Sequence, residues 1–299
     1  QISRIDLKKI DSDDVSFKIV PKINAAGRIS HARICVSQLM ATDISNAERT
    51  ASLLNNLNTK RQKIEQKIIL DIENRLLKNP RLLDNKLLFL WDDNWDPSVL
   101  GIAASKLSKK YYCPVILMSC IYEHAIGSGR SINDINIYKA LLDSENLLEK
   151  FGGHAMASGL TVKKDNLQLL NQNLNRHMEK TYSKKDFQKS MIVDAVLDLD
   201  DVNFNLAKEI DRLRPFGVAN REPIFICENV RVVSSYIMGN YHRKMVLEKA
   251  VPLCRHQVEA FHFNISDPDD LAEYYPKIAF KLKINKFKAT AAQIIIEDF

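Results

Sequence analysis

The sequence has no apolar run near the ~18–20 residues that a membrane helix needs. Its first segment, Gln1–Asp14, is polar and charged, so we expect neither a signal peptide nor a membrane partner. It also lacks an initiator Met, which favours a natural chain that starts upstream. Five cysteines are present without CxxC or Cys/His spacing, which indicates reduced thiols in a cytoplasmic protein rather than zinc or disulfides.

The sequence also lacks a 20–50-residue repeat and any low-complexity tract, so a solenoid or a fibrous chain is not expected. With 45% hydrophobic and 27% charged residues, the composition is that of a globular protein. Its 299 residues suit about two domains. The net charge of +6 is compatible with a polyanionic partner but does not establish one.

A long helical pattern begins near Ser45 and ends at Asn79-Pro80. Ser45 and Glu48 have the spacing of a capping box, in which each side chain satisfies a free N–H at the helix start. Apolar residues follow at mostly helical spacing, from Ala47 to Leu76. Such a helix would span ~50 Å at ~1.5 Å per residue. It fits either a strut between two lobes or a helix hairpin.

An alternating β and α pattern follows, which predicts an α/β sheet domain. Continuous apolar runs at Leu87–Trp91 and Val115–Met118 are typical of buried parallel strands. A further strand is expected at Leu160–Val162. The predicted helices cover Ser98–Lys110, Ile137–Lys150 and Asn166–Lys180.

The pattern changes after about Ser183 and a lysine-rich joint. One helix is expected over Phe204–Leu213. Short strands are expected at Ile192–Leu197, Ile224–Val233, Lys244–Glu248, Val258–Phe263, Lys277–Ile284 and Gln293–Ile296. So many short strands in one segment indicate a small barrel, of which the OB-like barrel is the best-known form that binds nucleic acid.

Two Gly-containing clusters carry an arginine. Asn24 and Arg28 flank a predicted flexible turn, where both can donate to a phosphate; a turn with a surface Arg is the alternative. Gly127–Ser131 reads GSGRS directly after a predicted strand. Its glycines allow close approach of backbone N–H groups to an anion, and its Arg and hydroxyls would complete a phosphate cradle. It is not a Walker A motif, because no GK[ST] follows.

Two further clusters mark turns. Gly152-Gly153 before His154 predicts a strained turn that points an imidazole at a ligand; a tight turn with a surface His is the alternative. The segment Arg214–Asn220, RPFGVAN, by itself marks only a turn that leads into the β region.

The order and spacing of these clusters are more specific than any one of them. The series NAAGR, long helix, WDPSVLGIAASKL, GSGRS, FGGHAMASGL and RPFGVAN resembles the RecJ branch of the DHH phosphoesterase superfamily over nearly the whole chain. The resemblance implies four parts. They are the end of a DHH catalytic domain at 1–44, a connecting helix at 45–80, an α/β DHHA1 substrate domain at 81–183, and an OB-like single-strand-binding domain at 184–299.

The activity implied by the resemblance is 5′-to-3′ hydrolysis of single-stranded DNA in DNA repair and recombination. Two divalent metals, Mn²⁺ or Mg²⁺, would do this chemistry on Asp and His ligands of an N-terminal domain. The chain has no Asp-His-His triplet, and Asp92, Asp93 and Asp96 have no His beside them, so we interpret these three as solvated loop residues. The chain would then supply substrate positioning and be inactive alone. The partners implied are single-stranded DNA, a helicase and a single-strand-binding protein.

The site residues implied by the resemblance fall into two groups. Those expected to hold substrate phosphate are Asn24, Arg28, Ser128, Arg130, Ser131, Gly152, Gly153 and His154. Those expected to contact the single strand on the barrel are Tyr236, Tyr241, His242, Arg243 and Lys244.

Two departures from the family pattern matter. Asp96 stands where the family usually has His, which puts a polar role of that position in doubt, and the GNPEP-like segment reads Ala219–Pro223. Two other functions stay open. The chain could be a single-strand-binding fragment without catalysis, or a phosphoesterase of the same superfamily that acts on short oligonucleotides. The predicted barrel argues against the second.

Overall fold

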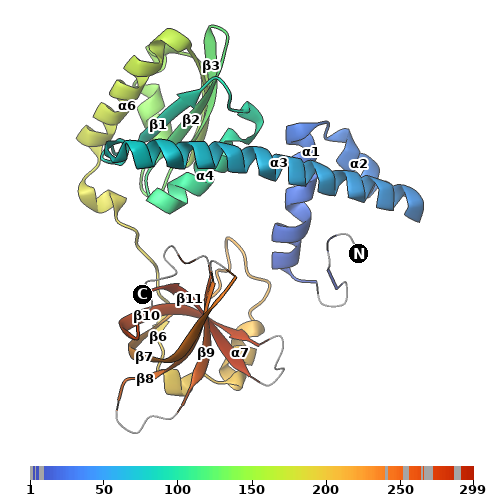
Figure 1. The fold of residues 1–299 in the computed structure, drawn as a ribbon, viewed down its shortest axis with the longest axis vertical. Helices are drawn as coiled ribbons and strands as arrows, with labels where there is room; N and C mark the ends of the chain where they lie inside the picture. Colours follow the sequence, from blue (N-terminus) through green and yellow to red (C-terminus); the bar gives the residue numbers. More distant parts are fainter. Residues whose placement is uncertain are drawn as a thin grey trace. The chain divides into compact units, whose positions relative to one another are not determined.

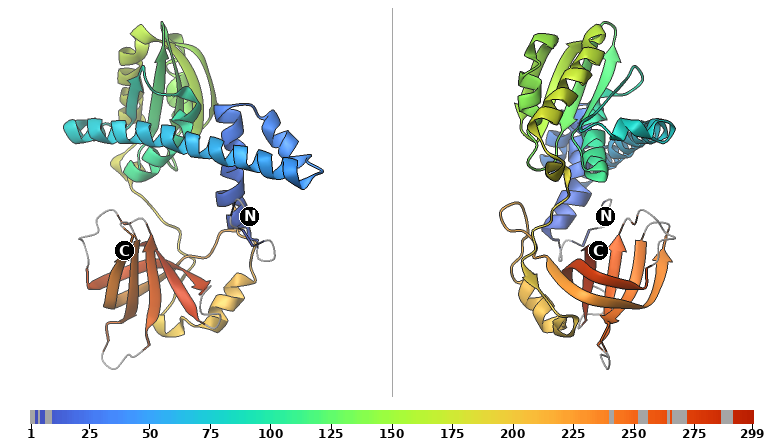
Figure 2. Two further views of the ribbon diagram at one scale, coloured as in Figure 1. Left: turned by 45° about the vertical axis from the view of Figure 1, so that its right-hand side comes forward. Right: turned by 90° about the vertical axis from the view of Figure 1, so that its left-hand side faces the viewer.

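The chain forms two compact units, Gln1–Lys189 and Ser190–Phe299. The computed structural model describes residues 3, 5, 6, 10–239, 242–251, 256–263, 265, 272–285 and 291–299. Figures 1 and 2 show a helical and mixed α/β first unit and a β-rich second unit. None of the described helices is both long and apolar enough to cross a membrane.

The first unit starts with short helices and continues into the α/β lobe. Its helices are η1 (Asp14–Ile19), α1 (Val20–Ile29), α2 (Arg33–Leu39), α3 (Ile44–Lys78), η2 (Pro80–Leu83), η3 (Pro97–Val99), α4 (Leu100–Tyr111), α5 (Ile137–Leu142), η4 (Glu145–Leu147), η5 (Lys164–Asn166), α6 (Leu167–Thr181) and η6 (Lys184–Phe187). Its strands are β1 (Leu88–Asp92), β2 (Val115–Ile121), β3 (His124–Arg130), β4 (Leu148–His154) and β5 (Ala157–Lys163).

Helix α3 is one continuous element of 35 residues, so the helix-hairpin alternative is wrong. In its first half Leu54 packs with Ala26 of α1 and Cys35 of α2. In its second half Ile68 and Ile72 are buried with residues of β1 and α4. Figure 1 shows α3 running from the N-terminal helices to the α/β lobe. One helix therefore joins the two parts of this unit.

The predicted capping box of α3 is wrong. The N-cap lies two residues before Ser45, where the Asp43 carboxylate accepts a hydrogen bond from the Asn46 N–H at 2.7 Å. Asp43 lies in extended backbone, the conformation that an N-cap residue requires, whereas Ser45 is already helical.

The cap gives a small stability prediction. We expect Asp43→Ala to lower the free energy of unfolding of the first unit by ~1 kcal/mol, because it leaves an N–H of the first turn unsatisfied. Ser45→Ala is the control, and it should change this free energy by less than ~0.5 kcal/mol. Urea titrations of both variants measure the difference, and equal effects would contradict the assignment of the cap.

The first unit contains a five-stranded sheet in the order β1-β2-β3-β5-β4. Strands β1 and β2 are parallel, as their apolar runs predict, and the other neighbours are antiparallel. Helices α5 and α6 cover one face through a cluster that includes Ile137, Leu141 and Leu170. Helices α3 and α4 pack with β1 and β2 through a second cluster. The opposite face therefore has helical cover at its β1–β2 end.

The predicted helix over Ile137–Lys150 is wrong in its second half. Helix α5 ends at Leu142, and the chain then becomes strand β4. Leu148 pairs with Val162 of β5, and Phe151 packs against the buried cluster between the sheet and α6. Strand pairing and burial of these side chains outweigh the helical spacing in the sequence.

The second unit is a closed barrel, which confirms the predicted OB-like fold. Its elements are β6 (Ala195–Val196), η7 (Leu199–Asp201), α7 (Phe204–Asp211), β7 (Phe225–Met238), β8 (His242–Lys249), β9 (Val258–Phe263), β10 (Tyr274–Ile284) and β11 (Ala292–Asp298). The strand order is β7-β8-β9-β11-β10, and β10 also pairs with β7, which closes five strands. Val230, Leu247 and Phe280 are fully buried inside. The predicted strand at Ile192–Leu197 shortens to the two residues of β6.

Candidate functional site

Gly127–Arg130 of the GSGRS segment lie within strand β3 itself, and not after a strand as the sequence predicts. Gly127 and Gly129 pair with Met118 and Ile116 of β2, whose side chains belong to the buried cluster under α5 and α6. Because side chains alternate along a strand, Ser128 and Arg130 point to the opposite face, the one on which α4 packs. The strand therefore presents a hydroxyl and a guanidinium side by side on one surface.

Gly101 of α4 makes the space that the Arg130 guanidinium occupies. A Cβ at position 101 would lie 2.8 Å from Arg130 Nη2 and 3.5 Å from Ser128 Oγ. Gly101 is the second residue of α4, where alanine is the better helix former, so a glycine at this position is a signal of close approach. That signal was present in the WDPSVLGIAASKL segment, but Gly101 was not among the expected site residues.

Arg28 reaches the same place from the N-terminal helices. Its Nη1 donates to the Ser98 carbonyl at 2.9 Å. Burial lowers the pKa of Arg130, and the nearby positive charge of Arg28 lowers it further. Arg130 itself donates from Nη1 to the Gly129 carbonyl at 2.7 Å. In the described part of the chain no ion pair joins either guanidinium to a carboxylate.

Asn24 and Arg28 lie in helix α1, so the predicted flexible turn around them is wrong. They are four residues apart, which places them on one face of the helix, and both are exposed. Asn24 therefore lies one turn from the arginine that meets Arg130.

The strand register brings the GGH segment to the same face. Directly paired residues of neighbouring antiparallel strands share a face of the sheet. One row runs Arg130, Ala157, His154, and the next runs Ser128, Gly159, Gly152. His154, Gly152 and Gly159 are exposed. The predicted residues Ser128, Arg130, Gly152 and His154 thus lie on one surface.

Gly153 has a different part in this arrangement. It points to the other face, paired with the buried Ser158, and its φ of 139° favours glycine. The turn of the hairpin lies at Ala155–Met156, after His154, and not at the glycines. The Ala155 and Met156 carbonyls accept from the Ile137 and Ser131 backbone N–H groups, both at 3.0 Å, so the hairpin tip is held to the lobe.

The glycines leave this part of the sheet bare. A Cβ at Gly152 would meet nothing within 4 Å, and one at Gly159 would meet only a carbonyl oxygen at 4.0 Å. A third row adds Ile126, which is 43% exposed, and the exposed Lys150. We call Arg28, Ser128, Arg130, Gly152, His154 and Gly159 the phosphate face. It has no side chains at Gly152 and Gly159, and it carries the positive charges of Arg28 and Arg130.

Ser131 is not on the phosphate face. It is buried, with 7% exposure, and its Oγ donates to the Ile135 carbonyl at 2.7 Å. The hydroxyl closes the turn between β3 and α5.

The barrel carries a second candidate surface on the outside of β7, β8 and β9. One row pairs Tyr236 with Lys244 and Lys244 with Phe261, and the next pairs His242 with Phe263. The Lys244 ammonium lies 5.4 Å from the Phe261 ring centroid, and the Phe261 and Phe263 rings stack at 6.1 Å. Tyr236 is 57% and Phe263 45% exposed. We call these five residues the aromatic face.

The aromatic face includes two phenylalanines that were not expected. Phe261 and Phe263 alternate in β9, a pattern that places both on one face of a strand. Tyr241 lies outside the described residues.

Arg243 is not on the aromatic face, contrary to the expectation for it. It is 3% exposed and lies in the barrel interior. Its guanidinium donates to Tyr275 Oη at 2.6 Å, to Ser235 Oγ at 3.1 Å and to the Ala272 carbonyl at 3.0 Å. Burial lowers the pKa of the neighbouring His262, and the charge of Arg243 lowers it further. Alternation along β8 turns Arg243 inward and its neighbour Lys244 outward.

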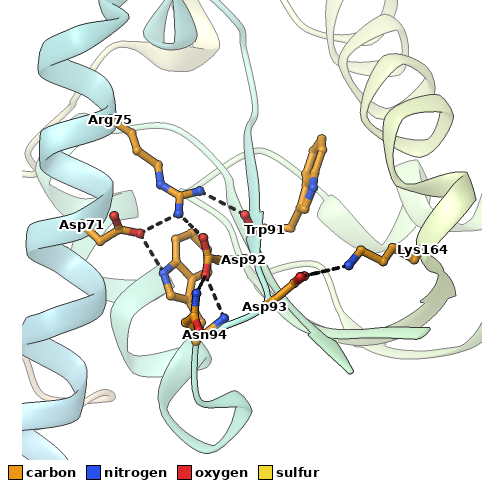
Figure 3. Close-up of polar contacts among 8 residues, drawn as sticks. Asp71, Arg75, Trp91, Asp92, Asp93, Asn94 and Lys164 are labelled. Carbon is orange, nitrogen blue, oxygen red and sulfur yellow. Dashed lines mark hydrogen bonds and ion pairs between the residues drawn. The ribbon is translucent and has the colours of Figure 1, made fainter. Parts of the chain in front are cut away.

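The three aspartates interpreted as solvated loop residues all have partners, and Asp93 is also exposed to solvent as expected; Figure 3 shows the contacts of Asp92 and Asp93. Asp92 pairs with Arg75 of α3, and Asp93 pairs with Lys164 at 2.9 Å. Burial is the largest influence on Asp92 and raises the pKa of its carboxyl, but hydrogen bonds from the Asn94 N–H and from Arg75 bring this pKa below the ordinary value. The hydrogen bond from Lys164 lowers the pKa of Asp93. Asp96 caps η3 by accepting from the Ser98 N–H at 2.9 Å.

A cavity of about 300 Å³ lies beside this network. Its lining comes from α3 and from the loop after β1: Ile64, Lys67, Ile68, Asp71, Arg75, Asp92, Asn94, Trp95 and Asp96. The Arg75, Asp71 and Asp92 side chains in it are already paired with one another.

The described residues do not form a metal centre. Among them, no group of three or more His, Cys, Asp or Glu side chains is arranged to hold an ion. The polar groups of the phosphate face are instead donors, which suit an anion and not a cation. We therefore derive no chemical step through a metal from this chain.

Comparison with known proteins gives domain matches over both units. Residues 84–180 match the family model of the DHHA1 domain, and residues 193–298 match that of the RecJ OB domain.

The relatives carry one description. The chain is 34% identical over 232 residues to a single-stranded-DNA-specific exonuclease RecJ of Bacillus subtilis, covering 77% of this chain and 29% of that protein. It is 28% identical over 311 residues to the Escherichia coli protein of the same description, covering 100% of this chain and 53% of that protein. The chain thus spans about half, or less, of the length of these relatives.

A solved structure shares the fold. A crystal structure of RecJ in complex with Mn²⁺ from Thermus thermophilus superposes with a TM-score of 0.77 at 23% identity, over 96% of this chain and 41% of that chain.

Proposed function

We propose, because the chain belongs to the RecJ family and carries its DHHA1 and OB domains, that it holds single-stranded DNA for 5′-to-3′ hydrolysis by a complete exonuclease. The chain spans only part of its relatives, so their activity enters as part of this proposal. The function of the chain itself would be to grip the 5′-terminal phosphate and to hold the following nucleotides.

The observation that carries the proposal is that Arg28 and Arg130 both lie against the start of α4: Arg28 donates to the Ser98 carbonyl at 2.9 Å, and a Cβ at Gly101 would lie 2.8 Å from Arg130 Nη2. Two like charges in one place repel each other, and burial together with the positive charge of Arg28 lowers the pKa of Arg130. A terminal phosphate would neutralise both and accept from both forks. Ser128 Oγ, beside Arg130, is a third donor, and His154 lies two strands away on the same surface.

The open space at two glycines supports binding of a nucleotide, and not only of a phosphate ion, on this face. Without side chains at Gly152 and Gly159, a sugar or base can lie against the strands themselves. Phosphodiester hydrolysis needs in-line geometry, so holding the end of the strand is a direct contribution to rate. We assign Asn24 a supporting role on the approach to Arg28, and Ser131 and Gly153 roles in shaping the turns.

The aromatic face would hold the strand further from its end. Exposed aromatic rings beside a cation bind single strands by stacking and by charge, with little sequence preference. Tyr236, Phe261 and Phe263 supply rings, and Lys244 supplies the cation. This arrangement supports binding of single-stranded DNA without readout of its sequence.

The hydrolytic groups are assigned to the remainder of the longer protein. We propose Mn²⁺ or Mg²⁺ as its cofactors, with ligands in an N-terminal catalytic domain of which 1–44 would be the end. The division into a connecting helix at 45–80, a DHHA1 domain at 81–183 and an OB-like domain at 184–299 is part of the same proposal. We also propose a role in DNA repair and recombination and a cytoplasmic location. The proposed protein partners are a helicase and a single-strand-binding protein.

A second function has one observation in its favour. A fragment that binds single strands without cutting them is consistent with the lack of a metal-ligand group among the described residues. A phosphoesterase for short oligonucleotides is less well supported, because the match to the RecJ OB domain implies a longer substrate.

A paired assay tests the proposal. The 299-residue chain is titrated with a 5′-phosphorylated single strand and, separately, incubated with it and Mn²⁺. We expect saturable binding that prefers the 5′-phosphate over a 5′-hydroxyl, and no cleavage by the chain alone. The complete protein should shorten long strands from the 5′ end. Metal-dependent cleavage by the chain alone, or equal affinity for both 5′ ends, would contradict the proposal.

A further inference from the structure

The loop between β1 and α4 is held in place by Arg75 of helix α3 (Figure 3). The Arg75 guanidinium donates to the Trp91 carbonyl at 3.0 Å, pairs with Asp92 and forms an ion pair with Asp71 at 2.8 Å. The Asp92 carboxylate also accepts from the Asn94 N–H at 2.7 Å. The start of the loop is therefore tied to α3 and folded back on itself.

Trp95 fixes the middle of the same loop. Its indole N–H donates to Asp71 at 3.0 Å, and its carbonyl accepts from Ser119 Oγ of β2 at 2.6 Å. The Arg75 guanidinium lies 5.0 Å from the Trp95 ring, which is only 5% exposed. A helix and a strand thus hold this loop from two sides.

The loop ends in a cap that holds an arginine of the phosphate face. Asp96 Oδ1 accepts from both the backbone N–H and the Oγ of Ser98, at 2.9 and 2.6 Å. The carbonyl of Ser98 in turn accepts from Arg28 Nη1 at 2.9 Å. The Asp96 carboxylate therefore holds Ser98 by its N–H and its hydroxyl, and the carbonyl of the same residue accepts from Arg28.

We propose that Asp96 is a positioning residue that acts through Arg28. By fixing Ser98, it keeps the exposed Arg28 side chain at the start of α4, against which Arg130 also lies, before any phosphate arrives. Ordering a free arginine side chain costs conformational entropy, and preorganisation removes that cost from binding. The inference rests on the proposed phosphate face. It gives Asp96 an indirect role, because a carboxylate would repel a phosphate that it touched.

A double-mutant cycle tests whether Asp96 acts on binding through Arg28. The affinity of the 299-residue chain for a 5′-phosphorylated single-stranded oligonucleotide is measured for Asp96→Ala, Arg28→Ala, the double variant and Asp96→Asn. Loss of an N-cap of this kind should weaken binding about fivefold in Asp96→Ala. Asp96→Asn should bind like the original chain, because asparagine caps equally well. The double variant should bind no more weakly than Arg28→Ala alone.

Asp93→Ala is the matched control, since Asp93 lies in the same loop but pairs with Lys164 away from this pathway. It should leave affinity unchanged. An additive loss in the double variant, or no rescue by Asp96→Asn, would overturn the positioning role and leave the phosphate face intact. If Arg28→Ala binds as well as the original chain, both the positioning role and the proposed phosphate face fail.

Discussion

Replacing Arg130 with alanine should weaken binding of 5′-phosphorylated single strands by tenfold to about a hundredfold. Hydrogen bonds to charged groups contribute ~1.5–3 kcal/mol, which corresponds to this range of affinity. Arg130 is half-buried beside Arg28, so its charge is poorly screened by water. In the complete enzyme the same variant should lower kcat/KM by at least tenfold. Fluorescence titration and a 5′-end nuclease assay measure the two effects.

Two controls distinguish loss of the contact between Arg130 and the phosphate from loss of positive charge on the protein in general. Arg176→Ala removes an exposed arginine from α6, which covers the opposite face of the sheet, and should change affinity less than twofold. The Arg130→Ala variant should lose its preference for a 5′-phosphate over a 5′-hydroxyl, because the lost contact is to the terminal group. An unchanged preference would show that Arg130 does not bind this phosphate.

The largest effect on stability is expected for Gly153→Ala. The backbone at 153 has a φ of 139°, which side-chain-bearing residues rarely adopt. A Cβ there would also overlap the Ala157 carbonyl oxygen and lie 2.7 Å from Ser158 Cα, both backbone atoms of the paired strand. Strain of this kind costs ~1–3 kcal/mol before the overlap is counted, so we expect a total of about 3 kcal/mol or more. Urea unfolding of the first unit measures it.

Gly152→Ala is the matched control, one residue away in the same strand. Its Cβ would meet nothing within 4 Å, so the free energy of unfolding should change by less than ~1 kcal/mol. The added methyl group would, however, stand on the phosphate face, and we expect it to weaken nucleotide binding several-fold. Equal stability losses in the two variants would contradict the different backbone roles assigned to the two glycines.

The sequence predicted the order of elements well where its pattern was local. The apolar runs of β1 and β2 and the short alternating strands of the barrel lie close to their expected positions. The segment around Asn24 and Arg28 was predicted as a turn because of Gly27, but Ala25 and Ala26 are buried in a helix. The second half of the predicted helix after Ile137 became a strand, because pairing with β5 gives its backbone groups hydrogen-bond partners. In both cases tertiary contacts outweighed local preference.

Residue types and motif order in the sequence were enough to predict the barrel, and they suggest the proposed chemistry: arginines, glycines and a histidine for a phosphate, and the barrel for a single strand. Which of these side chains share a surface was decided by the fold. Alternation along a strand turns Arg243 into the barrel and Lys244 out of it, and a shift of one residue would exchange them. Arg28 meets the Ser98 carbonyl across 70 positions of sequence, a contact that no local pattern encodes. Strand register decides which side chains lie on the same surface, and packing decides which distant residues come together. Both exist only in the folded chain.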